Sequence, residues 1–165
     1  MLDVAAQELD NLVSDAQKNQ YLIFALGPNH YGIDIKNVTE IIGIQKITKV
    51  PELPEYVQGI ISLRGKIIPV VDVRMRFKIE AVEYNDRTCI IIVDLGNVSV
   101  GLIVDGVADV LSFEDSEIVD TPGIEGDQNK FVKGVGKVGD EVKLLINCEK
   151  LLNDEDTDRL SEVRL

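Results

Sequence analysis

Side chains able to do chemistry are few in this sequence and widely spaced. The chain of 165 residues has one histidine, His30, beside a Pro-Asn turn, and two cysteines, Cys89 and Cys148, inside apolar runs. A general base or a zinc site needs several such side chains at a defined spacing. We therefore expect His30 to be a loop-edge residue and both thiols to be free and buried. We predict no metal site and no cofactor.

The segment 134–139 matches the G-x-G-x-x-G pattern of dinucleotide-binding loops. That pattern needs a strand before it and a helix after it, whereas residues 140–146 have the composition of a strand. We interpret the segment as part of a β-hairpin. The acidic cluster at 114–117 is typical of solvated surface in a chain with 29 Asp and Glu residues. No residue pattern supports a nucleophile with its base, so we predict that the protein is not an enzyme.

The charge of the chain excludes other classes of function. The formal net charge is −12 and the sequence pI is about 4.5, so nucleic acid and anionic membranes should repel the protein. The N-terminus carries Asp3 where a signal peptide carries a base, and no run approaches the roughly 18 apolar residues that a membrane span needs. We expect a cytoplasmic protein without nucleic-acid partners and without direct membrane insertion.

Hydrophobic spacing predicts short strands between two terminal helices. Residues 2–17 have apolar side chains at helical spacing, and the tail from 151 to 165 can form a short helix. Between them, apolar runs of strand length alternate with Gly and Pro breaks, which is typical of small β-barrels. The clearest hairpin has its turn at Arg64-Gly65-Lys66.

The strands occur twice in the chain. An offset of 69 places Gly32 on Gly101 and Glu40 on Asp109, and an offset of 75 places Gly59 on Gly134. The change of six residues falls in the loop 121–129, where insertions are tolerated. We predict a mainly β fold of two SH3-like five-stranded β-barrel lobes related by internal duplication. They form one domain over 1–165, with repeats at 18–78 and 88–153, and spacing leaves open whether the lobes exchange strands.

Arg64 distinguishes the two copies. At the offset of 75 its counterpart is Gly139, whereas at the offset of 69 Glu40 has the acidic counterpart Asp109. One interpretation is an exposed turn arginine. The other is a fork-shaped donor for a carboxylate, inside the protein or on a partner. We name Glu40 as the possible partner in an internal ion pair.

The hairpin sequence resembles that of the chemotaxis coupling proteins of the CheW family. The shared residues are Val50-Pro51, Pro54, Tyr56-Val57, Gly59-Ile60, Leu63-Arg64-Gly65, Ile67-Ile68-Pro69-Val70 and Asp72. The resemblance extends over about 18–153. It implies a non-enzymatic adaptor of two SH3-like barrels that couples the cytoplasmic tips of chemoreceptors to the histidine kinase CheA. It also implies association with receptor arrays at the membrane.

The resemblance further implies a receptor-binding side and leaves the kinase-binding residues unknown. CheA would be bound through its regulatory domain, which contains the same module. A paralogue in another receptor–kinase pathway, such as motility or development, is the alternative interpretation. Residues at positions that match the receptor-contacting side are Val38, Glu40, Ile41, Gly59 and Arg64.

Overall fold

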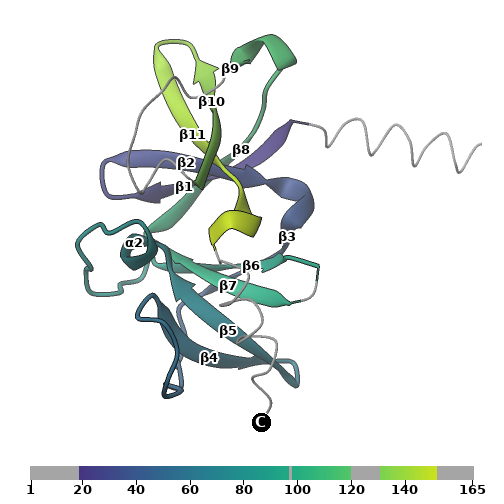
Figure 1. The fold of residues 1–165 in the computed structure, drawn as a ribbon. Helices are drawn as coiled ribbons and strands as arrows, with labels where there is room; N and C mark the ends of the chain where they lie inside the picture. The colour runs from purple at the N-terminus through teal and green to yellow at the C-terminus, as the bar shows by residue number, and fades with distance from the viewer. Residues whose placement is uncertain (1–18, 97, 120–130, 152–165) are drawn as a thin grey trace, which may run out of the picture.

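Two β-sheets, one above the other, make up most of the molecule (Figure 1). The structure is a computed structural model that describes residues 19–96, 98–119 and 131–151. The helix predicted over 2–17 and the one predicted in the tail after Leu151 lie outside the described residues. Within the described ranges, no helix is both long enough and apolar enough to cross a membrane.

The described strands form one sheet of six and one of five. The six-stranded sheet has the order β8-β1-β2-β11-β10-β9, and the five-stranded sheet has the order β3-β6-β7-β5-β4. The first comprises β1 (Gln20–Leu26), β2 (Asn29–Asp34), β8 (Gly106–Ser112), β9 (Ile118–Val119), β10 (Val132–Val138) and β11 (Glu141–Ile146). The second comprises β3 (Val38–Gly43), β4 (Val57–Leu63), β5 (Lys66–Asp72), β6 (Cys89–Asp94) and β7 (Ser99–Val104). The described residues also form four short helices: η1 (Ile35–Asn37), α2 (Val73–Arg76), η2 (Asp115–Glu117) and η4 (Cys148–Leu151).

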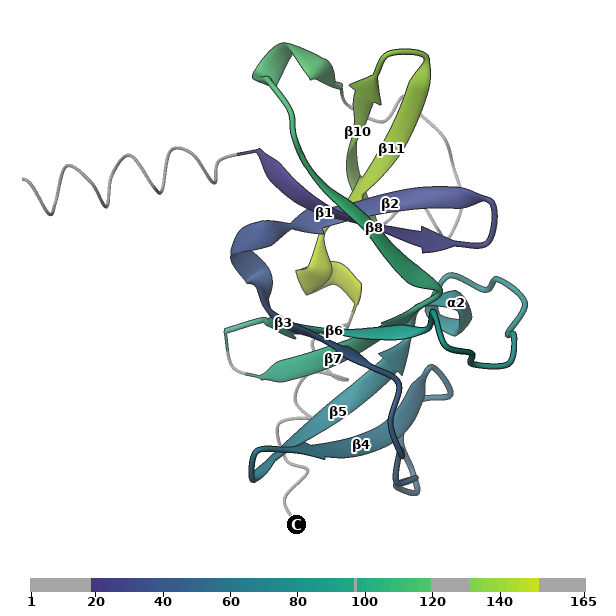
Figure 2. The same cartoon turned by 180° about the vertical axis from the view of Figure 1, so that it is seen from behind.

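Each sheet contains strands from both sequence repeats. The hairpin β1–β2 joins β8–β11, and the hairpin β6–β7 joins β3–β5. Two parallel pairings hold these exchanged hairpins, β2 with β11 and β5 with β7. The chain passes from one sheet to the other at η1 and again at Asp105, between β7 and β8 (Figure 2). The repeats at 18–78 and 88–153 are therefore not separate sheets.

Corresponding strands pair with the same register in the two sheets. Leu22 pairs with Val110 between β1 and β8, and their counterparts Ile91 and Ile41 pair between β6 and β3. In the parallel pairs, Val70 lies opposite Gly101, and the corresponding Leu145 lies opposite Gly32. The offsets of 69 and 75 therefore relate paired positions in space as well as in sequence.

The described strand pairings do not form closed barrels of five strands. Both sheets are open in the described part of the chain, with β8 and β9 at the edges of one and β3 and β4 at the edges of the other. After β3 the chain returns to β4 through a bridge between Thr48 and Ile60. The six-stranded sheet has an additional strand because β9 pairs with β10.

Three hydrophobic clusters form the core. The largest lies between the sheets and includes Phe24, Phe77 and Phe131. A second is formed by isoleucines and Val70 of the five-stranded sheet, and a third surrounds Phe113 in the six-stranded sheet. Strand β6 contributes alternate residues to the first and second clusters, so both of its faces are buried. This burial explains its continuous apolar sequence.

The predictions for the two cysteines and for the segment 134–139 are confirmed in part. Both cysteines are free; Cys148 is buried, whereas Cys89 is only half-buried, at the start of β6. Burial raises the pKa of the Cys148 thiol to about 12, so this group stays protonated at neutral pH. The segment 134–139 lies in the β10–β11 hairpin, as predicted, and the strand β11 follows it directly.

Candidate functional site

Arg64 sits in a turn whose backbone disfavours arginine. The β4–β5 hairpin closes through Arg64 and Gly65, with φ values of 51° and 81°. Positive φ at both central residues is the pattern of a type I′ turn, where Asn and Gly are preferred. A residue with a Cβ atom costs about 1–2 kcal/mol in this region. The corresponding residue in the other sheet is Gly139, with φ 58°. Arg64 is therefore present for its side chain and not for the turn.

The Arg64 side chain forms a two-pronged ion pair with Glu40 on β3. Arg64 Nη1 donates to Glu40 Oε2 at 2.8 Å, and Arg64 Nη2 donates to Glu40 Oε1 at 2.6 Å. A register shift between Val38 and Glu40 sets Glu40 opposite Ile92 of β6. The internal pair named from the sequence is thus present in the structure.

This ion pair contributes little to the stability of the fold. The side chain of Arg64 is 75% exposed and that of Glu40 is 25% exposed. An exposed ion pair contributes at most about 1 kcal/mol to the free energy of unfolding, because water and salt screen it. That gain is no larger than the backbone cost of arginine in the turn. Another molecule can therefore contact the pair, or replace one partner in it, at little cost to the stability of the fold.

A cavity of about 350 Å³ lies beside the ion pair. Leu63, Ile68 and Ile92 give it an apolar lining. Its polar lining comes from the ion pair, from one further residue of β3, from one further residue of the β4–β5 hairpin, and from both ends of the β6–β7 turn. Those additional polar residues are Thr39, Lys66, Asp94 and Ser99. The cavity combines an apolar surface with charges of both signs, which suits a protein segment better than a small apolar ligand.

The other three residues named from the sequence do not line this cavity. Ile41 is 42% exposed and lies next to Glu40 in β3, so its side chain points to the opposite face of the strand. Val38 packs against the core between the sheets. Gly59 is buried with φ 150°, and a Cβ atom there would lie 2.1 Å from the Thr48 carbonyl oxygen. Gly59 therefore permits the bridge between Thr48 and Ile60.

Sequence reasoning missed Lys66, Asp94 and Ser99. Lys66 follows Arg64 by two residues in the same turn, and this short spacing was a usable signal. Asp94 and Ser99 belong to the exchanged hairpin β6–β7, which the sequence assigns to the other repeat. Hydrophobic spacing is the same whether the hairpin stays in its own repeat or crosses to the other sheet. No signal in the spacing could have placed these two residues.

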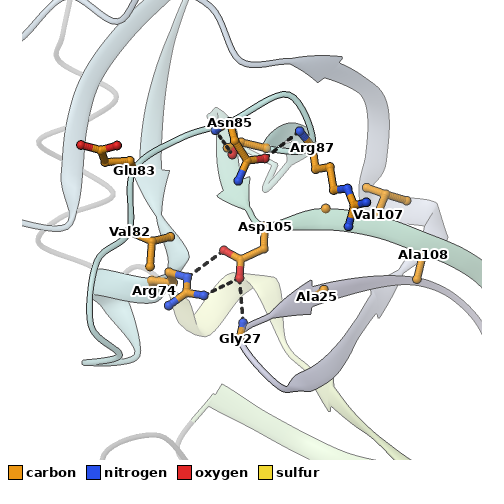
Figure 3. A pocket seen from close by; sticks show the side chains of 12 residues that line it. Ala25, Gly27, Arg74, Val82, Glu83, Asn85, Arg87, Asp105, Val107 and Ala108 are labelled. Carbon is orange, nitrogen blue, oxygen red and sulfur yellow. Dashed lines mark hydrogen bonds and ion pairs between the residues drawn. The ribbon is translucent and has the colours of Figure 1, made fainter.

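A second cavity, of about 510 Å³, lies where the two sheets meet (Figure 3). At its base, Arg74 of α2 faces Asp105, the residue between β7 and β8. Arg74 Nε donates to Asp105 Oδ1 at 2.7 Å, and Arg74 Nη2 donates to Asp105 Oδ2 at 2.5 Å. The Gly27 amide also donates to Asp105 Oδ2, at 2.7 Å. Three hydrogen bonds therefore converge on one carboxylate.

The pKa values of this pair follow from those bonds. The hydrogen bonds from Arg74 hold the pKa of the Asp105 carboxyl below its usual range, and the Gly27 amide adds to the effect. The Asp105 carboxylate in turn raises the pKa of Arg74. Both groups are charged at neutral pH. The ion pair would lose strength only in acid, as the pH falls through the lowered pKa of Asp105.

Arg76 makes a different contact between the repeats. Its guanidinium lies 4.5 Å from the ring centre of Tyr56 and 4.6 Å from that of Phe131. Its Nε donates to the Leu151 carbonyl oxygen at 2.5 Å. Burial lowers the pKa of Arg76, although the group stays charged at neutral pH. This contact ties α2 to the segment that begins β10 and to the end of η4.

These features define a class of protein. In the described part of the chain, no group of three or more His, Cys, Asp or Glu residues could hold a metal ion. What the geometry does offer is an exposed ion pair over a partly apolar cavity, on a rigid β scaffold. Such a surface recognises other proteins, so the fold and site define a protein-binding module.

Comparison with known proteins identifies the family. The model of the CheW-like domain matches residues 20–156. The chemotaxis protein CheW of Klebsiella aerogenes is 35% identical over 149 residues, which are 90% of each chain. That of Bacillus subtilis is 33% identical over 135 residues, covering 81% of this chain and 86% of the relative. The crystal structure of the scaffolding protein TtCheW from Thermoanaerobacter tengcongensis matches with a TM-score of 0.78 and 36% identity, over 84% of this chain and 94% of that chain.

The chain belongs to the CheW family, and it is a coupling adaptor of chemotaxis signalling. The resemblance seen in the hairpin sequence is confirmed. The family is one of scaffold proteins and not of enzymes.

Proposed function

We propose that the cavity beside Glu40 and Arg64 binds the cytoplasmic tip of a chemoreceptor, and that other surfaces bind the regulatory domain of the histidine kinase CheA. The observation that carries the proposal is the exposed arginine in a turn that disfavours it. A residue retained at a backbone cost, with little gain in stability, is most simply explained by a contact with a partner.

The chemistry of the cavity fits a helical receptor tip. A helix with an apolar stripe can place one side chain against Leu63 and Ile68, while its polar flank meets Arg64. A carboxylate on that flank can replace Glu40 as the acceptor for Arg64, because both acceptors give the same type of charge-assisted hydrogen bond. Ile41, exposed on the other face of β3, extends the apolar contact around the sheet edge.

The remaining residues of the proposed receptor side act through the backbone. Val38 anchors β3 in the core between the sheets, and Gly59 allows β4 to meet Thr48. These two residues hold Glu40 and Arg64 at the distance that their ion pair needs. We assign them a supporting role in the receptor site.

We also infer that each sheet corresponds to an SH3-like barrel left open in the described pairings, and that the two were produced by duplication of one unit within a single domain. The shared pairing registers support this inference. So does a second correspondence: Ile60 pairs with Thr48, and its counterpart Val135 pairs with Val119. The chain thus returns to the hairpin at matching points in both sheets. Receptor binding would place the adaptor in arrays beneath the membrane.

Reconstitution tests this function. Membranes containing chemoreceptors are mixed with CheA, with and without this protein, and autophosphorylation of CheA is followed. We expect the protein to raise receptor-dependent phosphorylation by a factor on the order of 10 to 100, if the kinase activity follows an equilibrium between two states that receptor binding shifts by a typical coupling free energy. Equal phosphorylation with and without the protein would show that it is not the coupling adaptor of that system.

A further inference from the structure

Only two segments of the described chain carry it from one sheet to the other. The first is η1, between β2 and β3, and the second is Asp105, between β7 and β8. The angle between the sheets depends on how firmly these crossings are held, in addition to the packing of the core between them. Asp105 is therefore in a position to control that angle.

Hydrogen bonds from both sheets hold the crossing at Asp105. We call this set of bonds from Arg74 and Gly27 to the Asp105 carboxylate the clamp. Arg74 belongs to α2, which directly follows β5 of the five-stranded sheet, and Gly27 belongs to the β1–β2 turn of the six-stranded sheet. The Asp105 carboxylate joins them through three hydrogen bonds (Figure 3). Arg74 Nη1 also donates to the Glu80 carbonyl oxygen at 2.8 Å. This bond holds the segment that leads to β6 against Arg74. The side chain of Arg74 is only 13% exposed, so water competes weakly for it.

Among the described residues, the crossing at η1 has no equivalent clamp. By the offsets of the repeat, Lys36 corresponds to Asp105 and Glu149 corresponds to Arg74. Both Lys36 and Glu149 are exposed, and among the described contacts they form no ion pair with each other. The clamp is therefore a property of one crossing, and duplication of the unit does not explain it.

We propose that Arg74 is a positioning residue whose ion pair with Asp105 fixes the angle between the two sheets. This inference rests on the proposed function, because an adaptor that holds a receptor and a kinase on different surfaces must keep those surfaces at a fixed orientation. With the clamp open, each surface keeps its own shape, but the orientation between them becomes variable. Binding to each partner is then retained, and transmission between them is lost.

Distance measurements between spin labels test the clamp. Ser62 on β4 and Lys137 on β10 are exposed and occupy corresponding places in the two sheets. Both are replaced by cysteine and labelled in a Cys89→Ser background, where the buried Cys148 stays unlabelled. We expect one narrow distance distribution in the parent protein and a distribution at least about twice as broad in Arg74→Ala and Asp105→Asn. Arg74→Lys keeps the positive charge but cannot form the two-pronged contact. Its distance distribution should therefore be broader than that of the parent and narrower than that of Arg74→Ala.

A matched control removes an ion pair that does not join the sheets. Lys133 donates to Asp34 at 2.5 Å, and this contact lies between β10 and the end of β2 in the six-stranded sheet. Asp34→Asn should leave the distance distribution as narrow as in the parent. The clamp does not set the angle if the distance distribution of Arg74→Ala is as narrow as that of the parent. The same holds if the distribution of Asp34→Asn is as broad as that of Arg74→Ala.

The functional consequence is measured in the same reconstitution. We expect Arg74→Ala and Arg74→Lys to bind receptor membranes and CheA separately with unchanged affinity, while receptor-dependent phosphorylation falls about tenfold in Arg74→Ala and less in Arg74→Lys. A broad distance distribution with full phosphorylation would overturn the positioning role. If the parent protein itself fails to raise phosphorylation, the proposed function fails, and the spin-label distances still decide whether Arg74 fixes the sheets.

Discussion

Replacing Arg64 by glutamate should reduce receptor-dependent activation of CheA by a factor on the order of 10 to 100, while the protein stays folded. The substitution sets two carboxylates side by side at the rim of the cavity, where the structure has a bidentate ion pair. Repulsion in so exposed a place costs at most about 1 kcal/mol in the free energy of unfolding. A partner carboxylate, by contrast, would lose its hydrogen bonds to Arg64 and meet a like charge. Urea unfolding and reconstituted phosphorylation measure the two effects separately.

Two control variants separate the charge of Arg64 from its place in the turn. Arg64→Gly gives the turn the residue that the other hairpin has at Gly139, so it should be at least as stable as the parent and still lose coupling. Lys137→Glu makes the same change of charge at an exposed site of the other hairpin and should keep coupling. Full coupling by Arg64→Glu, or equal loss in Lys137→Glu, would remove Arg64 from the site.

Replacing Gly59 by alanine should destabilise the fold by roughly 2–4 kcal/mol, through overpacking and backbone strain together. The new Cβ atom would lie 2.1 Å from the Thr48 carbonyl oxygen, and the residue would have to hold φ 150°. The bridge between Thr48 and Ile60 would open, and with it the return of the chain to β4. The midpoint of urea unfolding measures the loss.

Gly43→Ala is the matched control for Gly59→Ala. Gly43 ends the edge strand β3, its φ is not positive, and a Cβ atom there would meet nothing within 4 Å. We expect its free energy of unfolding to stay within about 0.5 kcal/mol of the parent value. If the two alanine variants are equally stable, Gly59 is not needed for the bridge. A direct role in partner contact would then be the better explanation of its place in the motif.

Much of the fold could be predicted because it depends on local pattern. Apolar alternation and Gly-Pro breaks indicate strands, and the offset of 75 that places Arg64 on Gly139 drew attention to an arginine at a turn position that holds glycine in the other copy. The comparison of the two copies also named Glu40, whose carboxylate pairs with Arg64 in the structure. The exchange of the hairpins β1–β2 and β6–β7 could not be predicted, because a strand has the same period whichever sheet it joins.

The roles of individual site residues needed three-dimensional detail. A one-residue register shift in β3 separates Val38, which packs in the core, from Glu40, which faces the cavity. Gly59 has a structural task because the backbone of Thr48 passes close to it, and that contact spans a loop with no regular pattern. Arg74 and Asp105 are 31 residues apart and meet only because the chain crosses between sheets at Asp105.

Photo-crosslinking from the rim of the cavity tests the central claim most directly. A photoreactive amino acid replaces Lys66, which lines the cavity beside Arg64, or Glu141, which occupies the corresponding position of the other hairpin. Each variant is irradiated in the presence of receptor membranes and CheA. We predict a covalent adduct with the receptor from position 66 and none from position 141. An adduct from position 141 alone, or equal adducts from both, would contradict a receptor site beside Glu40 and Arg64.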